Sequence, residues 1–383
     1  MAIVFLVTFQ GHLVAPLNNE LAWDLHSSKK LMDFVIPAFA LPYSVTALFY
    51  SMLANKLGRR LMITALTGLM AWGLLLISFA TSGFVFIITR VLVGIVTGGI
   101  VPISISVLAD LYHLDQRGKY FSWLVLALAG GMTFGPTFGA CLYTDIGWRA
   151  QFILLAIVCC LLFIGLDQKF RSFSVENKHP PLDMYTLYRK CSMLLKSQAG
   201  RRNYGFIFLN GVFHSGLFVW ISFYFSVTYQ FSDRAMGLGL LLFGLPGLLM
   251  AVAIATATAR YGRYKVVFAG LFVITLTIGL LVIKAPFWIS MLATGFLSVG
   301  YVMTQPFFVG IINNIRNGKT CAVTIGLGAC LLFMGYGLGP VIFIYLLKLG
   351  IGQALTLLTI LEICLGLLSW NPIKIKVKKT GIF

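Results

Sequence analysis

The chain has 383 residues, of which 59% are hydrophobic and only 10% are charged, whereas about 25% of the residues of a soluble domain carry a charge. So few charged side chains cannot cover a soluble protein of this length, and the composition therefore indicates a membrane protein. The 29 Lys and Arg residues outnumber the 11 Asp and Glu residues. Because these cations fall between apolar segments, we expect them to contact the lipid bilayer, and we expect no nucleic-acid partner.

Apolar segments long enough to span a bilayer recur along the whole chain. They predict an all-α membrane protein with twelve transmembrane helices, near residues 1–17, 33–56, 60–82, 84–112, 119–143, 149–167, 205–230, 235–258, 264–283, 286–313, 320–347 and 353–371. The first segment lacks the basic region and cleavage site of a secretory signal peptide, so we interpret it as a helix. It is short for a span, as a trimmed or misassigned native N-terminus would make it.

The loop charges predict an orientation. Of the 29 Lys and Arg residues, 22 fall on one side of the predicted bundle, six fall on the other, and Arg90 lies within a segment. The positive-inside rule then places both termini in the cytoplasm. We predict a first bundle at 1–167, a cytoplasmic linker at 168–204, a second bundle at 205–371 and a basic tail at 372–383. The linker contains a predicted amphipathic helix that tethers the halves along the membrane surface, with regulation as the alternative role.

Special residues recur at a constant offset of 204 positions. In chain order, Gly58, Pro102, Gly131, Gly135 and Pro136 recur as Gly262, Pro306, Gly335, Gly339 and Pro340. One offset serves three separate regions, which indicates a duplication. The sequence therefore predicts two pseudo-symmetric six-helix bundles.

Several motifs resemble those of the major facilitator superfamily. The loop SMLANKLGRRLMI at 51–63 is similar to the family signature G-x-L-a-D-r-x-G-r-r, with Ser51 and Asn55 replacing its first Gly and its acidic residue. The segment ITRVLVGIVTGGIVP at 88–102 resembles an R-x-x-x-G motif. GGMTFGPTFGA at 130–140 resembles a G-P-x-x-G motif associated with antiporters, and Pro136 within it is expected to bend its helix. The most similar subgroup is the twelve-helix drug:proton antiporters and related bacterial efflux permeases.

The resemblance implies a central cavity lined by segments one, four, seven and ten, and two bundles that open it to each side in turn. The implied substrate-binding residues are Gln10, His12, Thr97, Asn210, His214, Trp220, Tyr301, Thr304 and Gln305. The candidates for proton coupling are Arg90, His12, His214, Asp33 and Glu362, because ionisable groups in membrane helices are costly and often functional. The implied gating residues are Lys56, Gly58, Arg59, Arg60, Asp110, Gly131, Gly135, Pro136 and Gly139, with Asp110 pairing with Arg59 or Arg60 as a latch.

Each candidate has a structural alternative. The histidines can be satisfied hydrogen-bonding residues, Arg90 can extend toward the membrane surface, and Trp220 and Phe218 can serve packing. Asp33 can sit in water at the start of its helix, and Glu362 lies in a segment that is peripheral in the family. Many family members place a carboxylate in segment one, and this chain has none there.

These observations favour a secondary active transporter, functional as a monomer in a bacterial cytoplasmic (inner) membrane, that exports a drug-like solute in exchange for protons. The alternatives are a symporter or uniporter for a metabolite, and a transport-inactive receptor or scaffold, which the uncharged Asn55 would suit. The sequence carries no HExxH, phosphate-loop or nucleophile–base signature and no Cys/His metal spacing. We therefore expect neither an enzyme nor a bound metal or cofactor.

Overall fold

The computed structural model describes residues 1–112, 114–171, 184–230, 233–283, 286–305 and 318–369. Over these residues the chain folds into helices joined by short turns, with no strand. The helices are α1 (Ala2–His12), α2 (Asn18–Asp24), α3 (Lys29–Met32), α4 (Val35–Leu57), α5 (Arg59–Ser78), α6 (Gly83–Thr97), α7 (Ile100–Leu111), α8 (Leu114–Arg171), α9 (Met184–Lys196), α10 (Gln198–Tyr229), α11 (Asp233–Tyr261), α12 (Arg263–Val282), α13 (Phe287–Thr304), α15 (Gly318–Leu347) and α16 (Ile351–Ser369).

The helices confirm the predicted all-α membrane architecture and accommodate the twelve predicted segments. The fourth segment is divided into α6 and α7, and α8 holds the fifth and sixth segments, which part where Gly147 leaves the helical conformation (φ 69°, ψ 164°). Within the described residues, eight helical stretches are each long and apolar enough to cross a membrane, and α1 and part of α16 are shorter apolar helices.

The first connection differs from the prediction. α1 ends at His12, before the predicted end of its segment at residue 17, and the chain continues through tight turns in which the Ala15 N–H donates to the His12 carbonyl (2.9 Å). Pro16 lacks an N–H group and cannot continue the helical hydrogen bonding. The short helices α2 and α3, which the sequence did not indicate, follow. α2 is held in place because Asp24 Oδ2 accepts a hydrogen bond from Trp148 Nε1 of α8 (3.0 Å).

The linker region also differs in detail. Within the predicted linker at 168–204, the structure places α9, and it begins α10 at Gln198, so the second bundle's first helix extends below the predicted start at residue 205. α9 packs against α10 and α15, and its Leu187 and Cys191 are buried there. Tyr188, which the sequence placed on the apolar face, is instead exposed. The predicted amphipathic helix therefore exists, but only those apolar residues that face α10 and α15 are buried.

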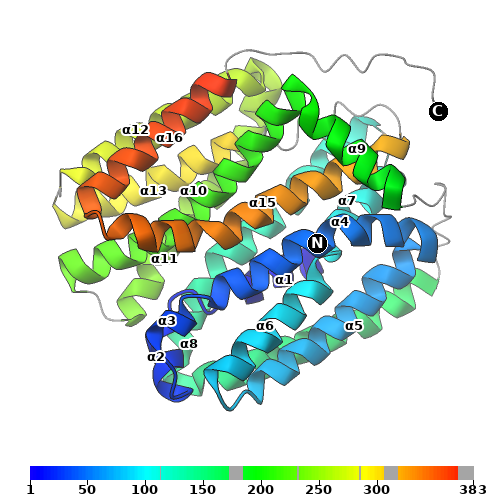
Figure 1. Ribbon diagram of the computed structural model, residues 1–383, viewed down its shortest axis with the longest axis horizontal. Coiled ribbons are helices and arrows are strands. Elements are labelled where there is room, and N and C mark those ends of the chain that lie inside the picture. Colours follow the sequence, from blue (N-terminus) through cyan, green and yellow to red (C-terminus); the bar gives the residue numbers. More distant parts are fainter. Residues whose placement is uncertain (113, 172–183, 231–232, 284–285, 306–317, 370–383) are drawn as a thin grey trace.

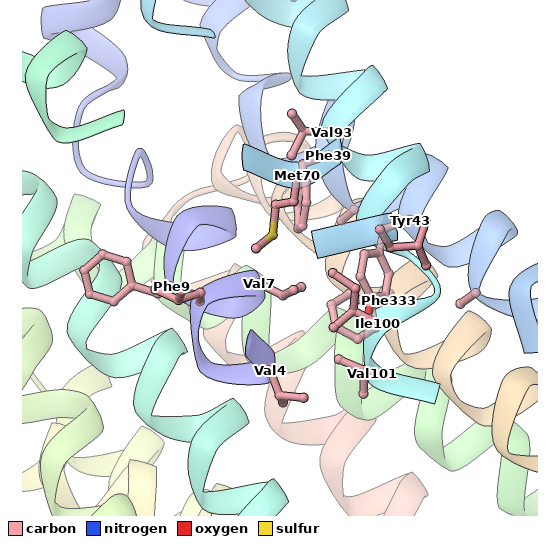
Figure 2. Packing of buried hydrophobic residues seen from close by; sticks show 14 of the residues in the cluster. Val4, Val7, Phe9, Phe39, Tyr43, Met70, Val93, Ile100, Val101 and Phe333 are labelled. Atoms are coloured by element: carbon pink, nitrogen blue, oxygen red, sulfur yellow. The ribbon is translucent and has the colours of Figure 1, made fainter. Parts of the chain in front are cut away.

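Helices α1–α8 and α10–α16 form two groups, visible in Figure 1 as the blue-to-teal and green-to-red halves of the molecule. The halves meet along two helix pairs, because α4 packs along α15 and α8 packs along α11. At the first pair, the ring centroids of Tyr43 and Phe333 lie 3.9 Å apart. Figure 2 shows both rings beside Ile100 and Val101 of α7. Phe333 of α15 thus belongs to the same buried core as residues of α1, α4 and α7.

The predicted duplication is visible in the backbone. Gly58 separates α4 from α5 with φ 96°, and Gly262 separates α11 from α12 with φ 86°. A positive φ at these values disfavours residues with a side chain. The two positions are 204 residues apart, so both halves make the same sharp turn with the same residue type.

A second duplicated feature is a glycine seam in each half. In α8, a Cβ at Gly131 or Gly135 would overlap the main chain of α1, and a Cβ at Gly135 would meet the carbonyl oxygen of Phe9. In α15, Gly335 and Gly339 lie against α10 in the same way, and a Cβ at Gly339 would meet the carbonyl oxygen of Val212. Small residues that let helix backbones approach are the usual means of packing helices in lipid.

We predict that Gly135→Ala destabilises the protein by about 1–3 kcal/mol, because the added methyl group meets main-chain atoms that cannot rotate away. The matched control is Gly165→Ala, in the same α8, where a Cβ meets nothing within 4 Å. Since alanine is the better helix former, the control should be neutral or more stable by up to about 1 kcal/mol. Thermal unfolding of both purified variants checks this, and equal midpoints would contradict the seam.

Candidate functional site

Arg90 of α6 is fully buried inside the first bundle. Its Nη1 donates to the carbonyl oxygen (3.2 Å) and the Oε1 (3.0 Å) of Gln10, its Nη2 donates to the carbonyl oxygen of Gly11 (2.8 Å), and its Nε donates to that of Val35 (3.4 Å). The guanidinium carbon lies 4.9 Å from the ring centroid of Phe39. The side chain thus points into the protein, connecting α6 with α1 and α4, and does not extend to the membrane surface.

The oxygens that accept hydrogen bonds from the Arg90 guanidinium all belong to neutral groups. Within the described part of the chain, no carboxylate pairs with it. Burying an ion without a counter-ion is costly, and several carbonyl dipoles offset only part of that cost. Three of the four acceptor atoms belong to Gln10 and Gly11, the last residues of α1 before His12, so the guanidinium group holds the end of α1 in place.

Five side chains from both halves form a group that we call the central aromatic cluster: His12, His214, Phe218, Tyr301 and Tyr336. His214 stacks on Tyr301 with ring centroids 3.7 Å apart, and the hydroxyl groups of Tyr301 and Tyr336 lie 2.7 Å apart. His12 of the first half lies 6.3 Å from the ring centroids of both Phe218 and Tyr336 in the second. The cluster therefore joins α1 to α10, α13 and α15.

The two imidazoles have different hydrogen bonding. His12 Nδ1 lies 2.9 Å from the carbonyl oxygen of Thr8, and because a carbonyl can only accept, Nδ1 carries the proton. Nε2 is then the acceptor nitrogen of the neutral ring. His214 Nδ1 is buried with no hydrogen-bond partner among the residues that the structure describes. Since buried polar atoms are normally paired, an unpaired imidazole nitrogen between two bundles is a candidate ligand-binding atom.

Three further predicted binding residues lie together in the second bundle. Asn210 Nδ2 donates to Thr304 Oγ1 (2.8 Å), and Gln305 Nε2 donates to Asn210 Oδ1 (3.1 Å). Thr304 Oγ1 in turn donates to the carbonyl oxygen of Tyr301. This network links α10 to the end of α13 and adjoins the central aromatic cluster through Tyr301.

The remaining predicted binding and proton-coupling residues make other contacts or lie outside the described side chains. Thr97 is buried, and its hydroxyl donates to the carbonyl oxygen of Val93 in its own helix (2.7 Å). Trp220 is buried and stacks on Tyr224 (4.9 Å), outside the cluster. Asp33 lies at the junction of α3 and α4, half-buried. Glu362 belongs to α16, and its side chain lies outside the described residues.

The predicted latch residues lie at the turn at Gly58 and in the last turn of α7, apart from the gating residues of α8 in the glycine seam. Arg59 is buried; its Nη2 donates to Asn55 Oδ1 (3.2 Å) and its Nη1 donates to the carbonyl oxygen of Ser106 in α7 (3.1 Å). Asn55 therefore supplies an uncharged acceptor where the family signature has an acidic residue. Arg60 is half-buried and Lys56 is exposed. Asp110 lies in the last turn of α7, one turn beyond Ser106, and its side chain is outside the described residues.

Sequence reasoning did not select Tyr336, although it contributes to the cluster from α15. Its only signal was its position between two glycines in GYGLGP at 335–340, a segment chosen for its glycine and proline residues. Tyr43 and Phe333, which join the halves at α4 and α15, gave no signal at all, because aromatic residues are common throughout this chain.

The comparisons with known proteins fit this architecture. A family model described as Major Facilitator Superfamily matches residues 1–306. The chain belongs to the Major Facilitator Superfamily, and it is accordingly an integral membrane protein of a family of transporters. Its helices superpose on the crystal structure of the human organic anion transporter MFSD10 (TETRAN) with a TM-score of 0.75 at 18% identity, covering 96% of this chain and 98% of that one.

Curated relatives include transporters of several kinds. Quinolone resistance protein NorA of Staphylococcus aureus (strain MRSA252) is 24% identical over 354 residues, covering 88% of this chain and 86% of that protein. MFS-type transporter hepF of Aspergillus oryzae is 26% identical over 275 residues, covering 65% of this chain. Multidrug resistance protein 2 of Bacillus subtilis is 26% identical over 179 residues, covering 45% of this chain. The matched regions span about half of the latter two relatives, 56% and 44% of their lengths.

We predict that Arg90→Lys lowers the stability of the protein by about 2 kcal/mol, because an ammonium group cannot match the fork that reaches α1 and α4 at once. The control is Arg189→Lys, at an exposed position of α9, where the midpoint of thermal unfolding should not change. Equal stability of the two variants would show that the guanidinium bonds to Gln10 and Gly11 contribute nothing to folding.

Proposed function

We propose that the chain is a secondary active transporter that works by alternating access and exports a drug-like or small organic solute in exchange for protons. The observation that carries this proposal is the central aromatic cluster. It is built from both halves, with members on α1, α10, α13 and α15, and it contains a buried imidazole nitrogen that no described residue bonds. A solute bound there would contact both halves at once, which is what coupling of solute binding to rocking of the bundles requires.

Export of drug-like solutes is supported by the relatives whose names describe quinolone resistance and multidrug resistance. Proton exchange is supported by His12 and His214, because histidine is the side chain whose ordinary titration falls nearest neutral pH. Asp33 and Glu362 lie on helices or junctions away from the cluster, so we assign the coupling to the two histidines, with Arg90 fixing the end of α1 beside His12.

The surrounding arrangement follows from the same proposal. The excess of cations at one end of the bundle orients both termini toward the cytoplasm, and we propose a bacterial cytoplasmic membrane as the location. The bundles at 1–167 and 205–371 would rock about the cluster, connected by the linker at 168–204 and followed by the tail at 372–383. A single chain contains both halves of the site, so we propose that the monomer is the functional unit.

For the gate, we propose that Arg59 forms a latch between the Gly58 turn and α7. Arg59 already bonds to Ser106 in α7, and Asp110 follows one turn later in the same helix. Gly131, Gly135, Pro136 and Gly139 of α8 would form the sliding surface for α1, with Lys56 and Arg60 beside the latch.

A second candidate function is symport or uniport of a metabolite. The absence of Asp and Glu from 1–12 favours it over exchange driven by an acidic group in α1. One relative, Vacuolar basic amino acid transporter 1 of Saccharomyces cerevisiae, is 27% identical over 188 residues, covering 48% of this chain and 32% of that protein. The transport-inactive alternative is disfavoured because Asn55 still engages Arg59.

We expect that the full chain, reconstituted in liposomes with an imposed pH gradient, moves at least one member of a drug-like solute panel faster than without the gradient. Replacing the imidazole by an amide in His214→Gln should reduce the gradient-dependent flux by about tenfold or more. The matched control is His26→Asn, an exposed residue with φ 47° that asparagine tolerates. Solute flux that ignores the gradient would favour uniport, and no flux of any solute would favour a receptor or scaffold.

We expect that Asp110→Asn weakens the latch and shifts the population toward the state in which the end carrying Arg59 is open. Labelling rates of a cysteine introduced near Gly58 should then rise, and transport should change with them. Asp145→Asn, an exposed carboxyl group at the opposite end of α8's first span, is the control. Unchanged labelling and unchanged transport in Asp110→Asn would remove Asp110 from the gate.

A further inference from the structure

The distribution of acidic residues restricts what the central aromatic cluster can bind. No Asp or Glu occurs at positions 1–12, 83–97, 198–229, 287–304 or 318–347, which are the spans of α1, α6, α10, α13 and α15. These helices supply all five members of the cluster and Arg90. A cationic solute would therefore find no side chain of opposite charge on any helix that forms the site, and unpaired ions are strongly disfavoured in such surroundings.

A buried positive charge adjoins the cluster along α1. The Arg90 guanidinium bonds to the carbonyl oxygens of Gln10 and Gly11, and the next residue in the chain is His12. The oxygens that accept its hydrogen bonds are all neutral, so they do not cancel its positive potential, which extends along the end of α1 toward the cluster. Coulomb attraction between the guanidinium group and an anionic solute is much stronger inside a lipid-embedded bundle than in water.

The cluster also offers matching short-range groups. His214 Nδ1 is buried, and no described residue bonds to it. His12 donates its Nδ1–H to the Thr8 carbonyl, so its Nε2 can donate to a carboxylate when the ring is protonated at both nitrogens. Around them, Phe218, Tyr301 and Tyr336 present ring faces or edges, and aromatic groups bind one another in offset or edge-on arrangements. An imidazole N–H is a good donor to a carboxylate.

We propose that the solute bound at the central aromatic cluster is an aromatic organic anion, with its carboxylate between His12 and His214 and its ring against Phe218 and Tyr336. This inference rests on the proposed transport function and specifies the charge class of its solute. It differs from binding of a cationic drug, for which this site provides aromatic rings but no counter-charge.

The test is a charge series at constant size: 2-naphthoate, 2-naphthamide and 2-naphthylmethylammonium. Each is titrated calorimetrically into the full chain in nanodiscs of uncharged lipid, so that membrane charge does not bias partitioning. We expect 2-naphthoate to bind more tightly than the ammonium compound by about tenfold or more, the difference that one charge-assisted hydrogen bond provides. Equal or tighter binding of the ammonium compound overturns the proposal, as does a lack of binding by all three.

A variant isolates the imidazole. His214→Phe keeps a ring that can stack on Tyr301 and removes the nitrogen, so it should lose the preference for 2-naphthoate and keep its affinity for 2-naphthamide. His26→Asn should keep the full preference. An unchanged preference in His214→Phe excludes His214 as the anion-binding group and overturns the assignment. If 2-naphthoate binds but a pH gradient does not drive its flux, the inferred charge class of the solute stands and proton exchange fails. If a pH gradient drives the flux of the ammonium compound alone, proton exchange stands and the inferred charge class fails.

Discussion

The structure depends on one buried cation. Arg90 places a guanidinium group inside an apolar bundle and satisfies it with oxygens on three different residues of α1 and α4. Because the group loses its hydration on entering the bundle, those oxygens must be presented at the right places, and this requirement holds the end of α1, which breaks before Pro16, against α6. The position of His12, and with it the first half's contribution to the cluster, follows from that constraint.

The second half holds its part of the centre together with neutral groups. Tyr301 and Tyr336 share a hydrogen bond, His214 stacks on Tyr301 and meets Phe218 edge-on, and the amide network of Asn210 and Gln305 holds α13 to α10. The two halves have thus diverged in how they hold the centre. One uses a buried ion and main-chain carbonyls, and the other uses aromatic stacking and side-chain amides, although both retain the same glycine turn and seam.

The number and approximate bounds of the helices can be predicted from the sequence, whereas the residues that meet at the centre cannot, for a physical reason. Segment lengths follow from bilayer thickness, and glycine landmarks such as Gly58 and Gly262 follow from backbone geometry. The rotation of each helix does not follow, because in lipid both the outward and the inward faces are apolar and the hydrophobic pattern loses its directional signal. On α10, for example, Phe218 and Trp220 are equivalent by type, yet only Phe218 reaches the cluster. The end of α1 and the role of Tyr336 depend on partners far away in sequence.

A mutation in either glycine seam is difficult to compensate by a second mutation on the facing helix. A Cβ at Gly135 or Gly339 would meet main-chain carbonyl oxygens of α1 and α10, and at Gly339 also the Ser215 side chain. The carbonyl oxygens are present whatever residue occupies Phe9 or Val212. No second substitution on the facing helix can make room for a larger residue at either glycine, unlike a contact between two side chains, where a smaller partner relieves the clash. Suppressors of seam mutations should therefore map outside the seam, to positions that loosen the bundle as a whole.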